Sequence, residues 1–354
     1  MRTAVYERYG PPEVMRLQQA ADPVAGEGEV LVRVEASTVG ASDSAGRSGT
    51  PRFARLFFGL TKPKHPVLGS DFAGVVERIG PGVSRFAPGD RVFGTLAPAM
   101  GAHAELVTIA EHGPIAHMPD GLDAAGAVAT VDGFLTALPF LRDVGRVRPG
   151  QRVLVNGASG TVGSAAVQLA RHFGAHVVGV CSAVHEPLVR SLGAEHVIDY
   201  THDDFTDARN TYDVIFDAVG KRSFGACRAA LTPHGIYLTT VPSAAIMLQW
   251  PLTRWFSRGR RAAITFTGLR DIRLKAADLP LLVELIESGA FVPVIDRVVA
   301  FDDIADAHRR VDSGHKAGSV VVAISQVPSA KPASRQVAPG DSAPSDSAPG
   351  EVAP

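Results

Sequence analysis

A short apolar run leads directly into closely spaced glycines at residues 152–163, RVLVNGASGTVG. Val153 to Val155 suit a buried parallel strand, and the residues after the turn repeat small apolar side chains at helical spacing. Gly157 permits a tight turn, Gly160 lets the backbone approach a phosphate, and Gly163 lets the helix pack close to the strand. Because the start of a helix offers free N–H groups and a positive dipole end, this segment predicts a site for a dinucleotide's diphosphate.

A second strand, His176 to Val180, follows at the distance that a βαβ unit requires. From there to residue 240 helices and strands alternate, which is typical of a doubly wound parallel sheet. Residues 264–268 are the candidate for its sixth strand. The earlier chain differs, because residues 30–36 alternate like a half-buried strand and Gly/Pro turn signals separate further strands.

We therefore expect an α/β fold in which a Rossmann sheet is inserted into a mostly β domain. The first part of the β domain is assigned to residues 1–126, the nucleotide-binding domain to 127–268, and the return to the first domain to 269–326. Residues 327–354 are rich in Pro, Ala, Ser, Gly and Asp and cannot bury enough surface to offset their ordering entropy, so we expect a disordered tail. A ligand would sit between the two domains.

Composition excludes several classes of function. The formal net charge of −1 gives no electrostatic case for nucleic acid. Cys181 and Cys227 are too few for a disulfide framework or a four-cysteine zinc site, which fits a reducing, cytoplasmic setting. The longest apolar candidate, Ala244 to Leu252, is broken by Gln249 and Pro251, so no segment reaching the ~20 residues of an integral membrane helix is expected.

Four further motifs accompany the glycine turn: KHPVLGSDFAGVVE at 64–77, FAPGDRVFG at 86–94, LGAEHVIDY at 192–200 and YDVIFDAVG at 212–220. In this order and spacing the chain resembles the medium-chain dehydrogenase/reductase superfamily. It is similar to the zinc-independent branch, near the quinone oxidoreductases and the reticulon-interacting mitochondrial reductase group. The resemblance covers residues 1 to about 325, and it implies a GroES-like catalytic domain around the Rossmann domain.

The positions that carry catalytic zinc ligands in the alcohol dehydrogenases of this superfamily have different residues here. Residues 39–44 read VGASDS without a thiol, and Gly69-Ser70-Asp71 replaces a Gly-His-Glu. Since a catalytic zinc needs about three ligands, we expect none. Without a Lewis acid, interconversion of simple alcohols loses its main catalyst, whereas quinones and α,β-unsaturated carbonyls delocalise the charge themselves. We therefore expect hydride transfer to a small-molecule quinone or enone. A zinc-independent alcohol dehydrogenase and a non-catalytic NADPH-binding sensor or interaction protein stay open as alternatives.

The end of the second strand, VCSAVHE at 180–186, has no acid at the place where NAD enzymes bind the ribose 2′-hydroxyl. Ser182 can donate a hydrogen bond to a 2′-phosphate, His185 occupies a position where relatives often carry Lys or Asn, and Tyr200 matches a tyrosine that contacts this phosphate in quinone oxidoreductases. NADP(H) is therefore expected rather than NAD(H). The expected cofactor-binding residues are Thr136, Gly157, Ser159, Gly160, Thr161, Val162, Gly163, Ser182, His185, Tyr200, Val219, Thr240 and Lys316.

The sequence offers no convincing general acid. Many zinc-independent relatives carry an asparagine where this chain has Gly40, so no catalytic side chain transfers there. The candidates for the cleft are Tyr6, Ser42 and Asp43.

The segment 243–263 joins an apolar stretch to three arginines, Arg258, Arg260 and Arg261. We expect a loop that covers the cleft or packs at the edge of a homodimer. Contact with a membrane surface or a partner is the alternative.

Overall fold

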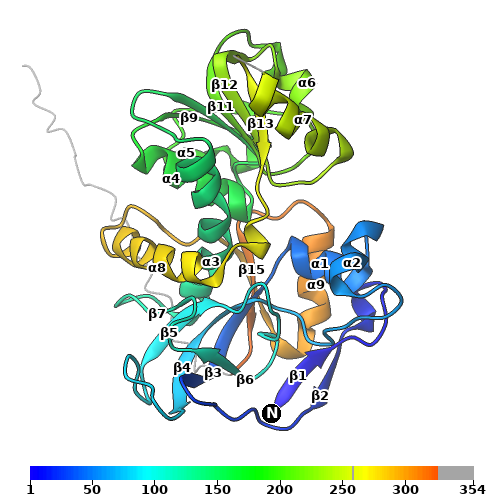
Figure 1. Ribbon diagram of the computed structural model, residues 1–354, viewed down its shortest axis with the longest axis vertical. Helices are drawn as coiled ribbons and strands as arrows, with labels where there is room; N and C mark the ends of the chain where they lie inside the picture. The colour runs from blue at the N-terminus through cyan, green and yellow to red at the C-terminus, as the bar shows by residue number, and fades with distance from the viewer. Residues whose placement is uncertain (257–258, 326–354) are drawn as a thin grey trace, which may run out of the picture.

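Two large sheets organise the chain in the computed structural model, which describes residues 1–256 and 259–325. The sheets form two lobes joined by helices and connecting chain (Figure 1). The predicted tail, 327–354, and Arg258 of the apolar–basic segment lie outside the described residues.

The upper lobe in Figure 1 contains a six-stranded sheet in the order β10-β9-β8-β11-β12-β13, with every neighbouring pair parallel. This order confirms the predicted doubly wound sheet. The strand order changes direction at β8, which lies between β9 and β11, and this is the topological switch point of the sheet. The strands are β8 Arg152–Asn156, β9 His176–Cys181, β10 His196–Asp199, β11 Tyr212–Asp217, β12 Leu231–Thr239 and β13 Arg261–Ile264. The helices are α4 Thr161–His172, α5 Glu186–Ser191, α6 Phe224–Cys227 and α7 Ala244–Phe256.

The lower lobe contains a seven-stranded sheet in the order β14-β15-β3-β4-β5-β7, with β6 also paired to β3. The strands are β3 Glu29–Val39, β4 Asp71–Ile79, β5 Arg91–Thr95, β6 Leu106–Ala110, β7 Ile115–His117, β14 Ile295–Ala300 and β15 Ser319–Ala323. A separate antiparallel pair is formed by β1 Arg2–Val5 and β2 Arg16–Gln19. Because β15 pairs antiparallel with β3, the end of the described chain rejoins the sheet that its first part began.

Helices α1 Ala41–Ser48, α2 Arg55–Phe58 and α9 Ile304–Asp312 lie at one side of this lower sheet, and α8 Ile272–Glu287 lies at the other (Figure 1). The lower lobe is therefore formed by residues from the first and the last part of the described chain. The exact bounds between the two domains stay a prediction.

Helix α3, Ala124–Leu138, joins the lobes and continues as a π-helical segment, Pro139–Val144. It packs on α4 above and on β3, β4 and β5 below. Gly133 is required at the upper contact, because a Cβ there would stand 2.6 Å from the Thr161 carbonyl oxygen. The crossing therefore places the middle of α3 directly beside the start of α4.

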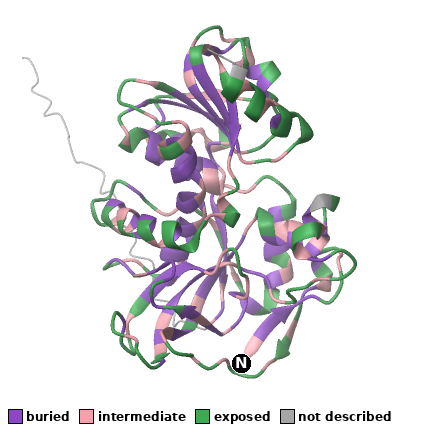
Figure 2. Cartoon of the chain, viewed as in Figure 1, coloured by how far each residue is buried: buried purple, intermediate pink, exposed green. Residues whose placement is uncertain are grey.

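The longest apolar helical segment is 124–144 rather than 244–252. By length and composition it could span a membrane, but 83% of its most apolar window is buried inside the protein. Figure 2 shows buried residues along this helix and through both sheets. The segment therefore serves as a core helix between two lobes.

The segment 243–263 differs from the predicted loop, because most of it forms helix α7 and strand β13 of the Rossmann sheet. The sixth strand is accordingly Arg261–Ile264 instead of 264–268. Thr253 fixes the helix to this strand, since its hydroxyl accepts a 3.0 Å hydrogen bond from the Ala262 N–H. Tertiary contacts of this kind let the helix continue through Pro251.

Candidate functional site

The glycine turn between β8 and α4 has the geometry of a phosphate cradle. Gly157 has φ of +80°, a conformation that favours glycine. A Cβ on Gly163 would stand 1.9 Å from the Gly157 carbonyl oxygen, whereas a Cβ on Gly160 would meet only that oxygen, at 3.5 Å. Gly163 is thus needed for packing, and Gly160 leaves an open face at the helix N-terminus, the kind of surface that binds phosphate groups.

Two neighbouring segments hold this turn in place. The N–H groups of Gly157 and Ala158 both donate to the Val180 carbonyl at 3.0 Å, and the Gly318 N–H donates to the Ser159 carbonyl at 2.7 Å. The Thr161 hydroxyl donates to the Gly318 carbonyl at 2.9 Å. The loop is therefore anchored both to β9 and to the chain that enters β15 from the other lobe.

Lys316 lies at the same junction. Its Nζ donates to Thr161 Oγ1 at 2.5 Å and to the Gly318 carbonyl at 2.7 Å. Burial lowers the pKa of its ammonium group, and the negative charge of Asp132 acts in the opposite direction. The structure thus brings together Ser159, Thr161 and Lys316, whose roles toward the cofactor stay predictions.

The carboxyl ends of β8, β11 and β12 form the next part of the edge. Asp217 accepts hydrogen bonds from the backbone N–H groups of Val219 (3.0 Å) and Gly220 (2.9 Å). Thr240 donates its N–H to the Asp217 carbonyl at 3.2 Å. Val219 and Thr240, both expected at the cofactor, therefore lie at one edge of the sheet, where ligands of open α/β folds bind.

At the other side of the switch point, Ser182 and Tyr200 are brought close by the ends of two strands. The Tyr200 N–H donates to the Cys181 carbonyl at 3.2 Å, and the Tyr200 side chain is 55% exposed. Ser182 and His185 are half-buried in the turn that follows β9. These three side chains can therefore face the same ligand group.

Sequence reasoning did not consider Asp199, the acid that ends β10. Its carboxylate accepts from the Thr201 N–H (3.0 Å) and the Thr201 hydroxyl (2.9 Å). The Thr201 N–H is also the main cause of the lowered pKa of this carboxyl. The backbone N–H of Ala183, in the turn after β9, also lowers this pKa, so Asp199 lies beside the turn that contains Ser182.

The three cleft candidates have different positions. Ser42 is exposed in the first turn of α1. Asp43 is buried, and its carboxylate accepts from the N–H groups of Gly40 at 2.8 Å and Gly69 at 2.9 Å, so it stabilises two backbone turns. Tyr6 is only 1% exposed and packs in the apolar core of the lower lobe, and its role at the cleft stays a prediction. Burial raises the pKa of its phenol.

A pair of interacting carboxyls, Asp71 and Asp132, was missed by sequence reasoning. Asp71 is buried at the start of β4, where the Thr38 hydroxyl donates to it at 3.1 Å. Burial, assisted by the negative charge of Asp132, raises the pKa of Asp71 to about 8. Burial also raises the pKa of Asp132. Asp132 lies one helical turn before Thr136, whose hydroxyl is 3.4 Å from its Oδ1. The available signal was a lone acid within an apolar helix.

Lys275 of α8 is a second missed residue. It is buried, and its Nζ donates to the carbonyls of Ala97 (3.0 Å) and Gly268 (2.9 Å). Burial lowers its pKa to about 8, and the charges of Asp71 and Asp132 oppose that shift. The two carboxyls and this lysine therefore belong to one electrostatic group between the lobes.

The residues at the superfamily's catalytic zinc position do not fit a zinc ion. Asp71 is engaged by Thr38, Ser70 is a weak ligand, and the nearby His103 directs Nε2 to the Thr38 carbonyl at 2.9 Å. In residues 1–256 and 259–325, no group of three or more His, Cys, Asp or Glu side chains could hold a metal ion.

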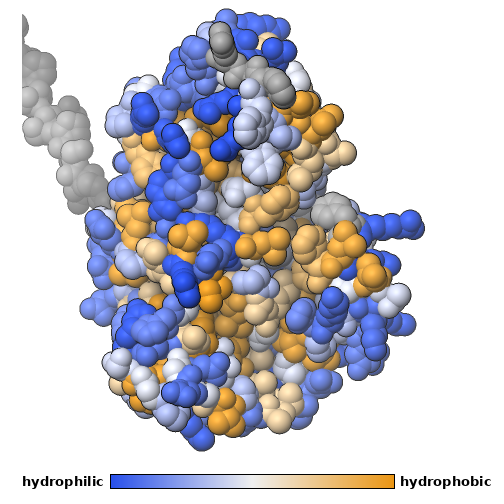
Figure 3. All heavy atoms as spheres, in the orientation of Figure 1, coloured by the Kyte–Doolittle hydropathy of each residue, from blue (hydrophilic) through white to orange (hydrophobic). Residues whose placement is uncertain are grey.

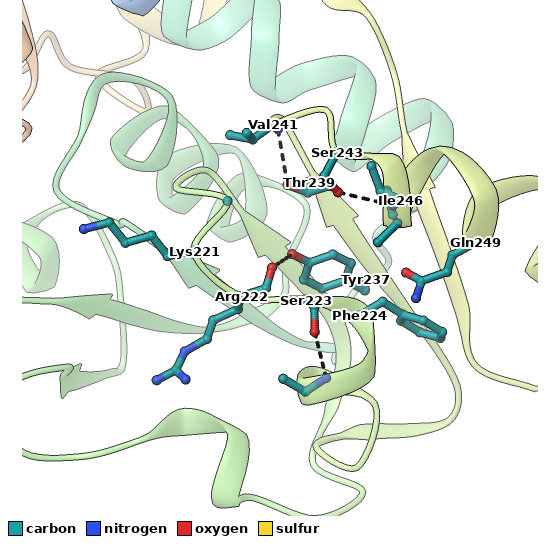
Figure 4. A pocket seen from close by; sticks show the side chains of 13 residues that line it. Lys221, Arg222, Ser223, Phe224, Tyr237, Thr239, Val241, Ser243, Ile246 and Gln249 are labelled. Atoms are coloured by element: carbon teal, nitrogen blue, oxygen red, sulfur yellow. Dashed lines mark hydrogen bonds between the residues drawn. The ribbon is translucent and has the colours of Figure 1, made fainter. Parts of the chain in front are cut away.

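A cavity of about 350 Å³ opens beside the loops after β11 and β12. Figure 4 shows Tyr237 at its floor, Ile246 and Gln249 on α7, and Lys221 directed away from the tyrosine. The Tyr237 hydroxyl donates to Asp217 Oδ2 at 2.7 Å. The cavity therefore shares a wall with the cofactor edge of the sheet.

Two known families match the chain. The alcohol dehydrogenase GroES-like domain matches residues 26–120, and the zinc-binding dehydrogenase family matches residues 192–322. The mouse mitochondrial NAD(P)H oxidoreductase RTN4IP1 is 31% identical, over 90% of this chain and 88% of its own. The Arabidopsis thaliana chloroplastic NADPH-dependent alkenal/one oxidoreductase is also 31% identical, over 91% of this chain and 79% of its own.

Solved structures agree with this placement. An alcohol dehydrogenase superfamily protein from Novosphingobium aromaticivorans is 26% identical with a TM-score of 0.79, over 92% of this chain and 100% of the other. The quinone oxidoreductase from Coxiella burnetii, 24% identical, shares the fold with a TM-score of 0.80 over 92% of this chain and 99% of its own.

Proposed function

The chain belongs to the medium-chain dehydrogenase/reductase superfamily, as a quinone-oxidoreductase-like NAD(P)H-dependent oxidoreductase, and from this we propose that it transfers hydride from NADPH to quinones or α,β-unsaturated carbonyls without zinc. The observation that carries the proposal is the open glycine cradle at Gly160. The polar residues between the lobes include Asp71, Asp132 and Lys275, and in the described part of the chain no set of side chains fits a zinc ion.

The described residues fit a dinucleotide along the carboxyl edge of the sheet. The N–H groups at the start of α4 would hold the diphosphate, with Thr161 and Lys316 beside them. Ser182, His185 and Tyr200 would hold the 2′-phosphate, and Val219 and Thr240 would line the other half of the cofactor. When bound, NADPH supplies a hydride.

The environment between the lobes favours a hydride acceptor whose conjugated system delocalises the negative charge that hydride addition creates. A conjugated carbonyl or quinone delocalises the charge that hydride addition creates, so its reduction needs less help from a Lewis acid than that of a simple carbonyl. Figure 3 shows apolar side chains gathered across the middle of the visible face, between the lobes. An apolar wall of this kind suits a ring or hydrocarbon chain conjugated to a carbonyl, and it would keep water from the reacting atoms.

The test is a substrate panel with the purified chain, in which absorbance reports the consumption of NADPH or NADH. We expect turnover with quinones and enones, preference for NADPH, and no effect of chelators. Tight NADPH binding with no turnover across the panel would contradict the proposal and favour a binding protein. Chelator-resistant oxidation of secondary alcohols without enone reduction would favour a zinc-independent alcohol dehydrogenase.

We further propose a cytoplasmic location.

A further inference from the structure

Three side-chain oxygens surround the backbone at Gly40, where the lower lobe meets α3. A Cβ on this glycine would stand 3.6 Å from Asp43 Oδ2, 3.8 Å from Asp132 Oδ2 and 3.9 Å from Ser42 Oγ. The glycine leaves that position without a side chain. A space about the size of one methyl group, lined by these oxygens, therefore lies where the lower lobe meets α3, and Asp132 contributes to its wall.

Asp132 is also placed beside the glycine cradle. The next residue, Gly133, is in contact with the Thr161 carbonyl at the start of α4. Lys316 Nζ donates to the Thr161 hydroxyl, and its positive charge acts to lower the pKa of Asp132. The half-buried Asp132 therefore lies between the phosphate-binding turn and the space at Gly40.

The two neighbouring carboxyls differ in what binds them. Asp43 accepts two backbone N–H groups and is committed to holding turns. Within the described part of the chain, the hydrogen bond that Asp132 makes is the long contact from Thr136. A carboxyl that is not committed to the backbone can exchange a proton with a ligand.

We propose that Asp132 donates the proton that completes enone reduction. The inference rests on the proposed reductase function. Hydride adds to the β-carbon of the enone, and the C=C electron pair moves to give an enolate. The carboxyl of Asp132 then gives its proton to the α-carbon, which breaks its O–H bond and forms a C–H bond. Solvent returns a proton to Asp132.

The groups around Asp132 support this role. Burial raises the pKa of its carboxyl, and the negative charge of Asp43 from α1 acts in the same direction. The charges of Lys316 before β15 and Lys275 from α8 act in the opposite direction.

The decisive variant is Asp132→Asn, assayed with an enone that carries an α-methyl group. The wild-type protein is expected to give one enantiomer of the reduced ketone. The variant is expected to lose about 100-fold or more in rate and to give a racemic product, because water then protonates both faces. NADPH affinity, measured by fluorescence, separates a loss of the proton donor from a loss of cofactor binding. Asp143→Asn, at the far end of the same helical segment, is the matched control.

A readout without cofactor tests the state of Asp132. Carboxyl ¹³C NMR of the aspartate-labelled apoprotein should show a resonance with a raised pKa that disappears in Asp132→Asn.

The outcomes separate the two proposals. Enone reduction by Asp132→Asn at the wild-type rate and with the wild-type stereochemistry would overturn the role of Asp132 and leave the reductase function intact. An inactive wild-type protein that binds NADPH would overturn the reductase function itself.

Discussion

Asn156 Nδ2 donates a 2.9 Å hydrogen bond to Asp217 Oδ1, and this bond joins the last residues of β8 and β11 beneath the cofactor edge. Asp217 also accepts from the N–H groups of Val219 and Gly220 and from the Tyr237 hydroxyl, and it has no exposed surface. The buried Asp217 carboxylate therefore links three parts of the lobe: strand β8, the loop after β11 and the cavity residue Tyr237.

Asp217→Ala should lower the free energy of unfolding by about 3 kcal/mol, because the donors around it become buried and unsatisfied. Chemical denaturation monitored by circular dichroism measures this change. Asp217→Asn, which keeps the shape and one acceptor oxygen, should cost less. Equal stability of Asp217→Ala and the wild-type protein would show that these hydrogen bonds add nothing to folding.

Gly160 and Gly163 should respond differently to the same substitution. Gly163→Ala forces a Cβ to within 1.9 Å of the Gly157 carbonyl, so it should distort the turn and lower the melting temperature. Gly160→Ala meets only an ordinary 3.5 Å contact at a φ of −74°, and should fold normally. It should still weaken NADPH binding by about tenfold or more, because the methyl group obstructs a hydrogen bond to a charged phosphate.

Calorimetric melting and fluorescence titration with NADPH separate these effects. A Gly160→Ala variant with wild-type affinity would place the diphosphate elsewhere. Gly150→Ala is unsuitable as a neutral control because Gly150 has φ of +79°, whereas Gly268 has open space around it and no positive φ. Gly268→Ala is therefore the control for adding a methyl group alone.

Ser182 and Tyr200 should set the preference between the two nicotinamide cofactors. Ser182→Asp puts a carboxylate at the end of β9, where it can bind a ribose 2′-hydroxyl and repel a 2′-phosphate. NADPH binding should weaken by about tenfold or more relative to NADH, since one charged hydrogen bond is worth about 1.5–3 kcal/mol. Titration with each cofactor measures the ratio, and Ser182→Asn controls for side-chain size.

Tyr200→Ala tests the other side of the same pocket. It should weaken NADPH much more than NADH, because its exposed side chain lies beside the end of β9. An equal loss for both cofactors would contradict the assignment of NADPH and leave the reductase class unaffected.

Local sequence pattern was sufficient for the first five strands of the Rossmann sheet, because each of these strands and the glycine turn carry their own signals over a few residues. It was insufficient for Asp71 and Asp132, which are 61 positions apart in the chain and meet only because α3 crosses the lower sheet. It also did not show that Tyr6 is buried in the lower lobe, where the Tyr6 N–H donates to the Pro66 carbonyl at 2.9 Å.

The helix over 244–256 was missed for a related reason. Gln249 and Pro251 interrupt its apolar pattern, so sequence favoured a loop, yet Thr253 and the parallel strand β13 stabilise a helix there. Long-range packing therefore overrode local propensity in the part of the chain that lies next to the cavity.

Asp296 should make the protein's stability depend on pH in the acid range. Its carboxylate accepts from Arg310 Nη2 at 2.6 Å, Arg310 Nε at 2.8 Å and the Ala317 N–H at 2.9 Å, and it thereby fixes the chain that leads from α9 to Lys316. The Arg310 and Ala317 hydrogen bonds outweigh burial and hold the pKa of Asp296 well below its usual range. A lowered pKa in the folded state stabilises the fold above the unfolded-state value, about 3.9, and this stabilisation is lost as the pH falls below it.

Asp296→Asn should therefore lower the free energy of unfolding by about 2 kcal/mol at neutral pH, and the difference from the wild-type protein should shrink as the pH falls below about 4. Urea unfolding at a series of pH values measures it. Asp302→Asn is the control, because its exposed carboxylate pairs only with Arg2 in the described chain, at 3.2 Å, and exposed pairs contribute little. A constant difference at every pH would mean that the introduced amide destabilises the protein through its shape rather than through the lost charge. Because the same segment carries Lys316 to the glycine turn, Asp296→Asn should also weaken NADPH binding at neutral pH.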